Sequence, residues 1–169
     1  MSVDLNRGAF SADNCSVART LAVVGEKWTM LVLREAFYGV RRFSEIQANL
    51  GIARNLLTDR LGTLVEHGIL DRETYQEPNS RARQEYRLTP KGHDLFPALI
   101  ALLQWGDTYL ADPAGPAVTV EHNDCGSAVH VELRCAHGHG PLTVRDVHPV
   151  PGPGALPSGA AGSPPRRSA

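Results

Sequence analysis

Three polar side chains with base-contacting chemistry lie close together just after Ala53. Arg54 can form a bidentate hydrogen bond with a guanine edge or contact a phosphate, and Asn55 can pair with an adenine. Thr58 can contact a phosphate or a thymine methyl group. All three fall at the beginning of an expected helix, which is the end that enters the major groove in helix-turn-helix proteins. This chemistry points to contact with duplex DNA.

The spacing of apolar residues predicts the helix that carries these side chains. Its inner face recurs at helical intervals and comprises Ala53, Leu57, Leu61, Leu64 and Val65. A shorter helix precedes it, with Ser44 as the expected N-cap and Gly51 as the residue that ends it. Two helices joined by such a short turn form the arrangement that places a second helix in a groove.

A β-hairpin with a basic tip is expected directly after the helix pair. Residues 69–76 and 84–89 have strand-like composition and flank a turn that contains Pro-Asn-Ser. Arg81 and Arg83 stand at the tip, where they can reach phosphates or the minor groove, and Arg87 lies on the returning strand. The alternative is an ordinary solvated turn, and the preceding helix pair favours DNA contact. Arg60, on the flank of the apolar face, is either a phosphate contact or an internal ion-pair partner.

The charge balance neither requires nor excludes this interpretation. The chain has 169 residues and a formal net charge of −1, which is low for a nucleic-acid-binding protein. Its positive charges cluster at residues 41–42 and 81–87, whereas Asp59 would repel DNA unless it meets a cytosine amine or orients an arginine. A local basic stripe on a neutral protein favours a sequence-specific regulator. The predicted DNA contacts are Arg42, Ser44, Arg54, Asn55, Thr58, Arg60, Arg81 and Arg83.

Helices are also expected on both sides of this segment. Residues 15–24 and 27–38 form two candidates split by Gly25, and Thr89-Pro90 starts another that should run to about Leu110, with a kink or restart at Pro97. That last helix is apolar around too much of its circumference for its own small domain to cover. We therefore predict a two-fold homodimer, with interface residues Leu95, Leu99, Ile100, Leu103 and Trp105.

Residues 15–110 resemble the HxlR family of winged helix-turn-helix regulators, which are relatives of the MarR type in bacteria. The matching motifs are CSVARTLAVVGEKWTMLVLREAFYGVRRFSEI, LLTDRLGTLVEHGIL, EYRLTPKGHDL and LLQWGDTYL. The resemblance implies a homodimer that represses or activates transcription at a palindromic operator, with helices flanking the winged domain at the dimer interface. Nothing in the family pattern suggests catalysis.

Cys15 occupies the position at which some HxlR members sense electrophiles or oxidants. Asn14 would cap the helix, and both the helix start and Arg19 would favour the thiolate. The alternative is a small, half-buried packing residue. A small-molecule effector is the competing source of control.

The region after residue 112 extends beyond this plan. Residues 113–116 suggest a linker, and residues 118–122 and 128–133 suggest two strands around a turn. A cluster of potential zinc ligands follows the pattern of a small zinc ribbon but lacks its last cysteine; its members are His122, Cys125, Cys135, His137 and His139. The alternative is a degenerate remnant that folds as a plain hairpin. From Pro149 onward, six prolines and four glycines predict a disordered tail.

The whole chain is therefore predicted as mainly α with a small β-wing: a winged helix-turn-helix with flanking dimerisation helices and a small C-terminal β-hairpin extension. We expect a DNA-binding and dimerisation domain over 1–112, the extension over 113–148 and the tail over 149–169. The three cysteines and the lack of a long apolar run indicate a cytoplasmic protein. A winged-helix protein–protein module without DNA affinity remains the alternative function.

Overall fold

The computed structural model describes residues 7–11, 13–76 and 82–157, which form two compact units. One unit runs from Val23 to Val131, and the other combines the residues up to Ala22 with those from Glu132 onward. Every described residue of the predicted DNA contacts belongs to the first unit, whereas Arg81 lies outside the described residues. The division at 131/132 falls inside the extension predicted for 113–148, so the first part of that extension belongs with the helices.

Among the described residues, four α-helices precede the hairpin. They are α1 (Ser16–Val24), α2 (Lys27–Phe37), α3 (Phe43–Leu50) and α4 (Arg54–Glu66). Helix α2 begins where the Glu26 carboxylate accepts hydrogen bonds from the backbone N–H groups of Trp28 and Thr29, at 2.9 and 3.2 Å. A short 3₁₀ helix, η1 (Arg7–Ala9), lies in the other unit.

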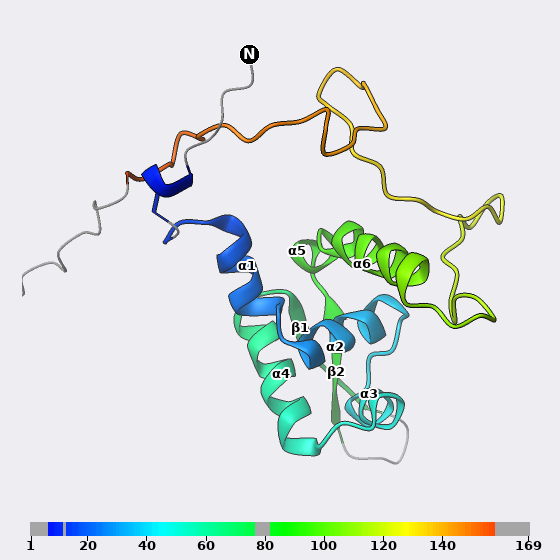
Figure 1. The fold of residues 1–169 in the computed structure, drawn as a ribbon. Helices are drawn as coiled ribbons and strands as arrows, with labels where there is room; N and C mark the ends of the chain where they lie inside the picture. The colour runs from blue at the N-terminus through cyan, green and yellow to red at the C-terminus, as the bar shows by residue number, and fades with distance from the viewer. Residues whose placement is uncertain (1–6, 12, 77–81, 158–169) are drawn as a thin grey trace, which may run out of the picture. The chain divides into compact units, whose positions relative to one another are not determined.

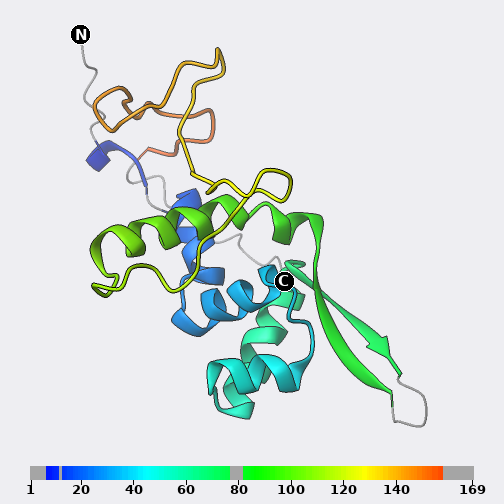
Figure 2. The ribbon, with the colours of Figure 1, turned by 90° about the vertical axis from the view of Figure 1, so that its right-hand side faces the viewer.

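The hairpin pairs β1 (Leu70–Tyr75) with β2 (Arg83–Leu88) in antiparallel register, from Leu70 opposite Leu88 to Tyr75 opposite Arg83. Figure 2 shows the two strands projecting beyond the helices of their unit. The base of the hairpin is joined to the segment before α3, since the N–H of Tyr86 donates to the carbonyl of Arg41 at 2.9 Å. The wing is therefore attached directly to the helix pair.

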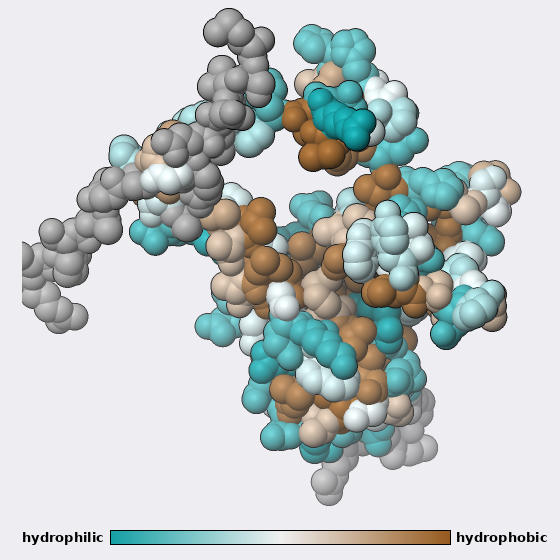
Figure 3. Space-filling view, in the orientation of Figure 1, coloured by the Kyte–Doolittle hydropathy of each residue, from teal (hydrophilic) through white to brown (hydrophobic). Residues whose placement is uncertain are grey.

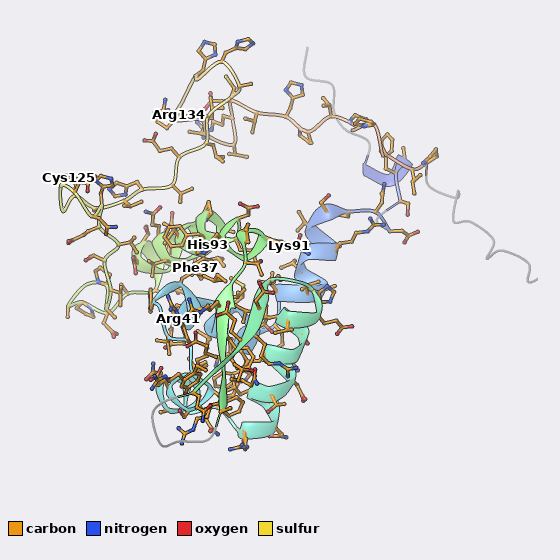
Figure 4. The ribbon with its side chains drawn as sticks, turned by 180° about the vertical axis from the view of Figure 1, so that it is seen from behind. Phe37, Arg41, Lys91, His93, Cys125 and Arg134 are labelled. Atoms are coloured by element: carbon orange, nitrogen blue, oxygen red, sulfur yellow. The ribbon has the colours of Figure 1, made fainter. Side chains whose placement is uncertain are left out.

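Two helices follow the hairpin, α5 (Pro90–His93) and α6 (Phe96–Tyr109), so the predicted restart at Pro97 is confirmed. Thr89 caps α5 by accepting a hydrogen bond from the N–H of Gly92 at 3.0 Å. A Cβ at Gly92 would lie 2.3 Å from the carbonyl oxygen of Ile69, so only glycine allows this close approach. Phe37 and His93 lie side by side in an edge-on ring contact, which ties α2 to α5 (Figure 4).

One apolar core holds these elements together. Helices α2 and α4 lie side by side, and each contacts the hairpin (Figure 1). The buried side chains of this core cluster come from the end of α1, from α2, α3, α4 and the turn between the last two, and from the start of the hairpin: Val24, Val32, Leu33, Ile46, Ile52, Leu57, Leu61, Leu64, Ile69 and Leu70. Burial of this set fixes the orientation of α4 relative to the wing.

The segment from residue 113 to Val131 packs against α6. The Gln104 side chain donates to the carbonyl of Val129 at 2.7 Å and accepts from the N–H of Val131 at 3.0 Å. The two predicted strands are reduced to a single bridge between Glu121 and Ala128. Most residues of this segment are exposed, so water can satisfy their backbone groups without a continuous strand ladder.

The other unit pairs residues 10–11 with residues 156–157. Within it, the N–H of Ser11 donates to the carbonyl of Leu156 at 2.8 Å, and Phe10 forms a bridge with Pro157. Leu156 and Pro157, which belong to the predicted tail, thus contact residues near the N-terminus, and residues 158–169 of that tail lie outside the described residues. Within the described part of the chain, no helix is long and apolar enough to cross a membrane.

Candidate nucleic-acid interface

Helices α3 and α4 meet at a tight turn that the sequence specifies. Gly51 ends α3 in the left-handed conformation, with φ 61°, and Ile52 is buried beside it. The predicted N-cap role of Ser44 is wrong, because Arg42 occupies that position and Ser44 is the second residue of α3. The helix pair with its three-residue turn is otherwise the predicted one.

The apolar spacing predicts the inner face of α4 except at its first position, because Ala53 is the exposed N-cap and not a buried helical residue. Leu57, Leu61 and Leu64 are buried. Arg54, Asn55, Thr58 and Asp59 are exposed on the first turns of the helix. The Thr58 hydroxyl donates to the carbonyl of Arg54 at 2.9 Å, so its proton is used within the helix and its methyl group is left for an apolar contact. The amide and guanidinium groups required for base contact therefore reach solvent at the helix start.

A hollow of about 450 Å³ separates the start of the two helices from the hairpin. Three guanidinium-bearing residues line it from three different elements: Arg42 before α3, Arg54 on α4 and Arg83 on β2. The remaining lining residues are Phe43, Ser44, Tyr75, Gln84 and Tyr86. Convergent arginines among hydroxyl and amide groups form a site suited to phosphate oxygens.

Two of these arginines are held by aromatic rings. The Arg54 guanidinium carbon lies 5.3 Å from the centre of the Phe43 ring, and that of Arg42 lies 4.8 Å from the centre of the Tyr75 ring. Cation–π contacts of this kind hold a planar guanidinium without consuming its hydrogen-bond donors. Arg42 is also ion-paired with Glu45 at 3.9 Å, so its guanidinium is shared between the Tyr75 ring, that carboxylate and the hollow.

Two further arginines are engaged in internal ion pairs. Arg60 Nε lies 3.7 Å from the Glu26 carboxylate that caps α2, so the geometry favours the internal alternative over a phosphate contact. Arg87 pairs with Glu85 at 2.5 Å and with Glu73 at 2.9 Å. Its hydrogen bond to Glu85, reinforced by the charge of Glu73, raises the pKa of Arg87 above its ordinary value.

Sequence reasoning missed the aromatic and amide lining of the hollow. Phe43, Tyr75, Gln84 and Tyr86 gave no separate signal because each fits an ordinary helix or strand pattern. Strand alternation combined with the hairpin register would have found one relationship, since Tyr75 pairs directly with Arg83. The contact of Tyr75 with Arg42 depends on tertiary packing and has no local signature.

The predicted dimer residues divide into two groups. Ile100 is buried within its own chain, Leu95 packs against the core, and Leu99 and Leu103 are half-buried, so these residues mainly serve the protomer. Trp105 is 57% exposed. The large apolar side chains of α6 that are more than half exposed are Leu102, Trp105 and Tyr109, and of these only Trp105 belongs to the predicted interface. The spacing of three and four residues places all three on one stripe.

Cys15 immediately precedes α1 and is half-buried. The Asn14 side chain bonds the carbonyl of Gly154, and Arg19 Nε donates to the carbonyl of Asp13 at 3.2 Å. The carbonyl of Cys15 accepts the first helical hydrogen bond, from the N–H of Arg19 at 3.0 Å.

The predicted zinc ligands form two separate pairs. Cys125 Sγ lies 3.4 Å from His122 Nδ1, and Cys135 Sγ lies 3.4 Å from His139 Nδ1, with the His137 ring beside that of His139. Hydrogen bonds from the side chain and backbone of Ser127 lower the pKa of Cys125. The two pairs belong to different units. Across residues 7–11, 13–76 and 82–157, no three His, Cys, Asp or Glu side chains gather closely enough to hold a metal ion.

Comparison with known proteins decides the family. Residues 23–113 match the model of the HxlR-like helix-turn-helix, which is more than half of the chain. The chain belongs to the HxlR family. Its members among the curated relatives include an uncharacterized HTH-type transcriptional regulator of Mycobacterium tuberculosis, which is 50% identical over 139 residues, covering 82% of this chain and 87% of the relative.

Solved structures agree with this assignment. The chain is 41% identical to PA1607, described as a candidate transcription factor, with a TM-score of 0.72 over 82% of this chain and 96% of the other. A second such protein, from Pseudomonas aeruginosa, gives 36% identity and a TM-score of 0.57 over 83% and 94%. The redox regulator HypR in its oxidized form gives 30% identity and a TM-score of 0.52 over 58% and 100%.

The winged helix-turn-helix prediction is therefore confirmed, and so is the HxlR resemblance. This member of the HxlR family is a transcriptional regulator with a helix-turn-helix DNA-binding domain, and the family comprises regulators and not enzymes. The α4 face and the arginine-lined hollow are the parts of that domain with the chemistry to contact DNA.

Proposed function

We propose that this protein is a homodimeric, sequence-specific regulator whose α4 enters the major groove while the hairpin contacts the adjacent backbone. The observation that carries this proposal is the hollow between α4 and the hairpin. Arg42, Arg54 and Arg83 converge on it, and two of the three are held by aromatic rings. A phosphate seated there would fix the register of α4 on the duplex, so that Asn55 and Thr58 meet base edges.

The wing contributes affinity without sequence preference. Arg83 is exposed on β2 next to the hollow, and Arg81 completes the predicted basic tip outside the described residues. Contacts between arginines and phosphates release counterions, so they make binding strongly dependent on salt. A protein–protein module with the same fold would show no DNA binding and therefore no such salt dependence.

The second copy is proposed to pack on the exposed stripe of α6. Leu102, Trp105 and Tyr109 are 58%, 57% and 68% exposed, and the rings of Trp105 and Tyr109 lie 5.3 Å apart. Helix α1 also exposes two apolar side chains, Val17 and Leu21. Figure 3 shows hydrophobic residues gathered over this helix. Two-fold packing through such faces would space two α4 helices by about one DNA turn, ~34 Å, or a multiple of it, and would match a palindromic operator.

Thiol modification is the proposed source of control that the family supports. HypR, a structural neighbour, is described as a redox regulator, and Cys15 immediately precedes α1 in this chain. Modification would add a bulky or polar group beside the apolar surface of α1. Operator release by diamide in the unmodified protein, and its loss in Cys15→Ser, would support this control. Equal release in both proteins would exclude Cys15.

The experiment that tests the proposed function measures affinity against salt. DNA fragments enriched from a random pool by the purified full chain are titrated at ~50 and ~200 mM salt. A reader with several phosphate contacts loses orders of magnitude in affinity between the two. Failure to enrich any DNA, or an affinity that does not respond to salt, would favour the protein–protein module.

A further inference from the structure

An apolar cleft of about 250 Å³ lies between α2 and α6, away from the α4 surface. Its lining is aliphatic and aromatic apart from Arg34, the one charged side chain among the described residues that form it. The other lining residues are Met30, Leu31, Tyr38, Phe96, Leu99, Ile100, Leu102 and Leu103. A single guanidinium in an otherwise apolar cleft complements a molecule that has an apolar body and one negative charge.

Arg34 is already bound to a carboxylate at its inner end. Its Nη2 and Nε donate to Glu35 Oε1 at 2.8 and 3.2 Å. The Arg34 side chain is 37% exposed, whereas that of Glu35 is 5% exposed. The guanidinium therefore lies between the open cleft and a buried carboxylate.

Glu35 connects this ion pair to the DNA-binding half of the unit. Its second oxygen, Oε2, accepts a hydrogen bond from the Asn49 side chain at 2.8 Å. Asn49 is the penultimate residue of α3, directly before the turn at Gly51 that sets the direction of α4. Three side chains thus link the cleft to the helix-turn-helix.

We propose that this cleft binds a small apolar monocarboxylate through Arg34, and that binding weakens the hydrogen bond by which Glu35 holds Asn49 on α3. Cavities of about 150 Å³ accommodate benzene, so this cleft has room for a bicyclic aromatic acid. A carboxylate is favoured because the planar guanidinium pairs with it in bidentate geometry. Arg34 is the charged anchor that the cleft offers to such a ligand.

The coupling follows from competition for one cation. A ligand carboxylate that draws Arg34 outward leaves Glu35 as a buried charge without its ion-pair partner, which is strongly unfavourable. Glu35 can relieve this by moving, and its bond to Asn49 transmits the movement to the end of α3. The expected result is lower DNA affinity with ligand bound. This coupling rests on the proposed function, whereas binding of the ligand does not.

The first test is calorimetric titration of the full chain, without DNA, using 2-naphthoate and its uncharged isostere 2-naphthamide. We expect naphthoate to bind at least tenfold more tightly than the amide. The double variant Arg34→Met with Glu35→Gln removes the cation without stranding a buried carboxylate, and it should lose the preference for the acid. The matched control is Arg72→Met on β1, which should keep the preference for the acid over the amide. Thermal melts verify that both variants fold.

Equal affinity for the acid and the amide, or no binding of either, would overturn the proposal. A second copy of the chain is the rival occupant of the cleft, because Leu102 belongs to both the cleft and the exposed stripe of α6. Naphthoate binding by a monomeric Trp105→Asp variant but not by the unmodified protein would assign the cleft to that second copy and would also overturn the proposal.

The second test measures DNA affinity with and without saturating naphthoate. We expect at least a threefold loss of affinity in the unmodified protein. Asn49→Ala should bind naphthoate equally well but show a smaller loss, because the link to α3 is removed. Unchanged DNA affinity in the unmodified protein at saturation would overturn the coupling. A protein that binds naphthoate but never binds DNA would refute the proposed function and not the ligand site.

Discussion

The guanidinium of Arg54, the first residue of α4, lies over the ring of Phe43, the first residue of α3, with 5.3 Å between the guanidinium carbon and the ring centre. The contact joins the starts of the two helices of the helix-turn-helix. It also restricts Arg54 before any DNA arrives, so less conformational entropy is lost when the side chain binds.

Replacing Phe43 by Leu keeps an apolar side chain but removes the aromatic face. We expect DNA affinity to fall by about 0.5–1 kcal/mol, the size of an exposed cation–π contact. Phe43 also packs against the core, so the melting temperature must be measured beside the affinity. Phe43→Tyr retains the face and serves as the control. A Leu variant that binds DNA as tightly as the Tyr variant would show that the ring does not preorganise Arg54.

Arg83 and Arg87 form a matched pair on β2. Arg83 faces the hollow, whereas Arg87 is bound by Glu73 and Glu85. We predict that Arg83→Ala weakens binding to all DNA sequences and reduces the slope of log affinity against log salt by roughly one unit. Arg87→Ala should leave the slope unchanged. If the two variants behave alike, the hairpin contacts DNA nonspecifically along its whole length or not at all.

Dimerisation is tested at Trp105, because this side chain is exposed on α6 and its loss leaves the protomer core intact. We expect Trp105→Asp to weaken the dimer by roughly 2 kcal/mol or more, as hot-spot aromatic residues do. Operator affinity should fall with it. Ile100→Asp is unsuitable for this test, because Ile100 is 3% exposed in its own chain and the change would unfold the protomer. A mass measurement that finds the unmodified protein monomeric would contradict the proposed dimer.

Two glycines with opposite surroundings test the description of the fold. A Cβ at Gly92 meets the carbonyl oxygen of Ile69 at 2.3 Å, whereas one at Gly62, in the middle of α4, meets nothing within 4 Å. We predict that Gly92→Ala destabilises the protein by about 1–3 kcal/mol through overpacking. Gly62→Ala should stabilise it by roughly 0.5–1 kcal/mol through helix propensity. Denaturant unfolding measures both, and the same sign for both changes would contradict the described packing.

Local patterns were sufficient for the helix pair, the hairpin and the restart of the last helix. Each of these depends on nearby residues: the apolar spacing of α4, the glycine at position 51, and the proline at position 97. The same patterns could not show which side of α6 is already used within the protomer. Ile100 and Trp105 look equally apolar in sequence, and only packing against α2 separates them.

The parts of the binding surfaces that lie within one helix turn or one strand could be predicted from the sequence. Asn55 and Thr58 lie on the exposed start of α4 as expected. By contrast, the lining of the hollow and the link from Arg34 to Asn49 combine residues from separate elements. The partner of Arg60 is likewise distant in sequence, since Glu26 precedes it by two helices.

The most direct test of the central claim compares the base preferences of the unmodified protein with those of Asn55→Ala, by sequencing the DNA that each enriches from one random pool. We predict that the unmodified protein enriches a palindromic sequence. The variant should lose about 1–3 kcal/mol of affinity and relax its preference at one base pair in each half-site. Identical preferences in both proteins would contradict the account and place base recognition outside the start of α4.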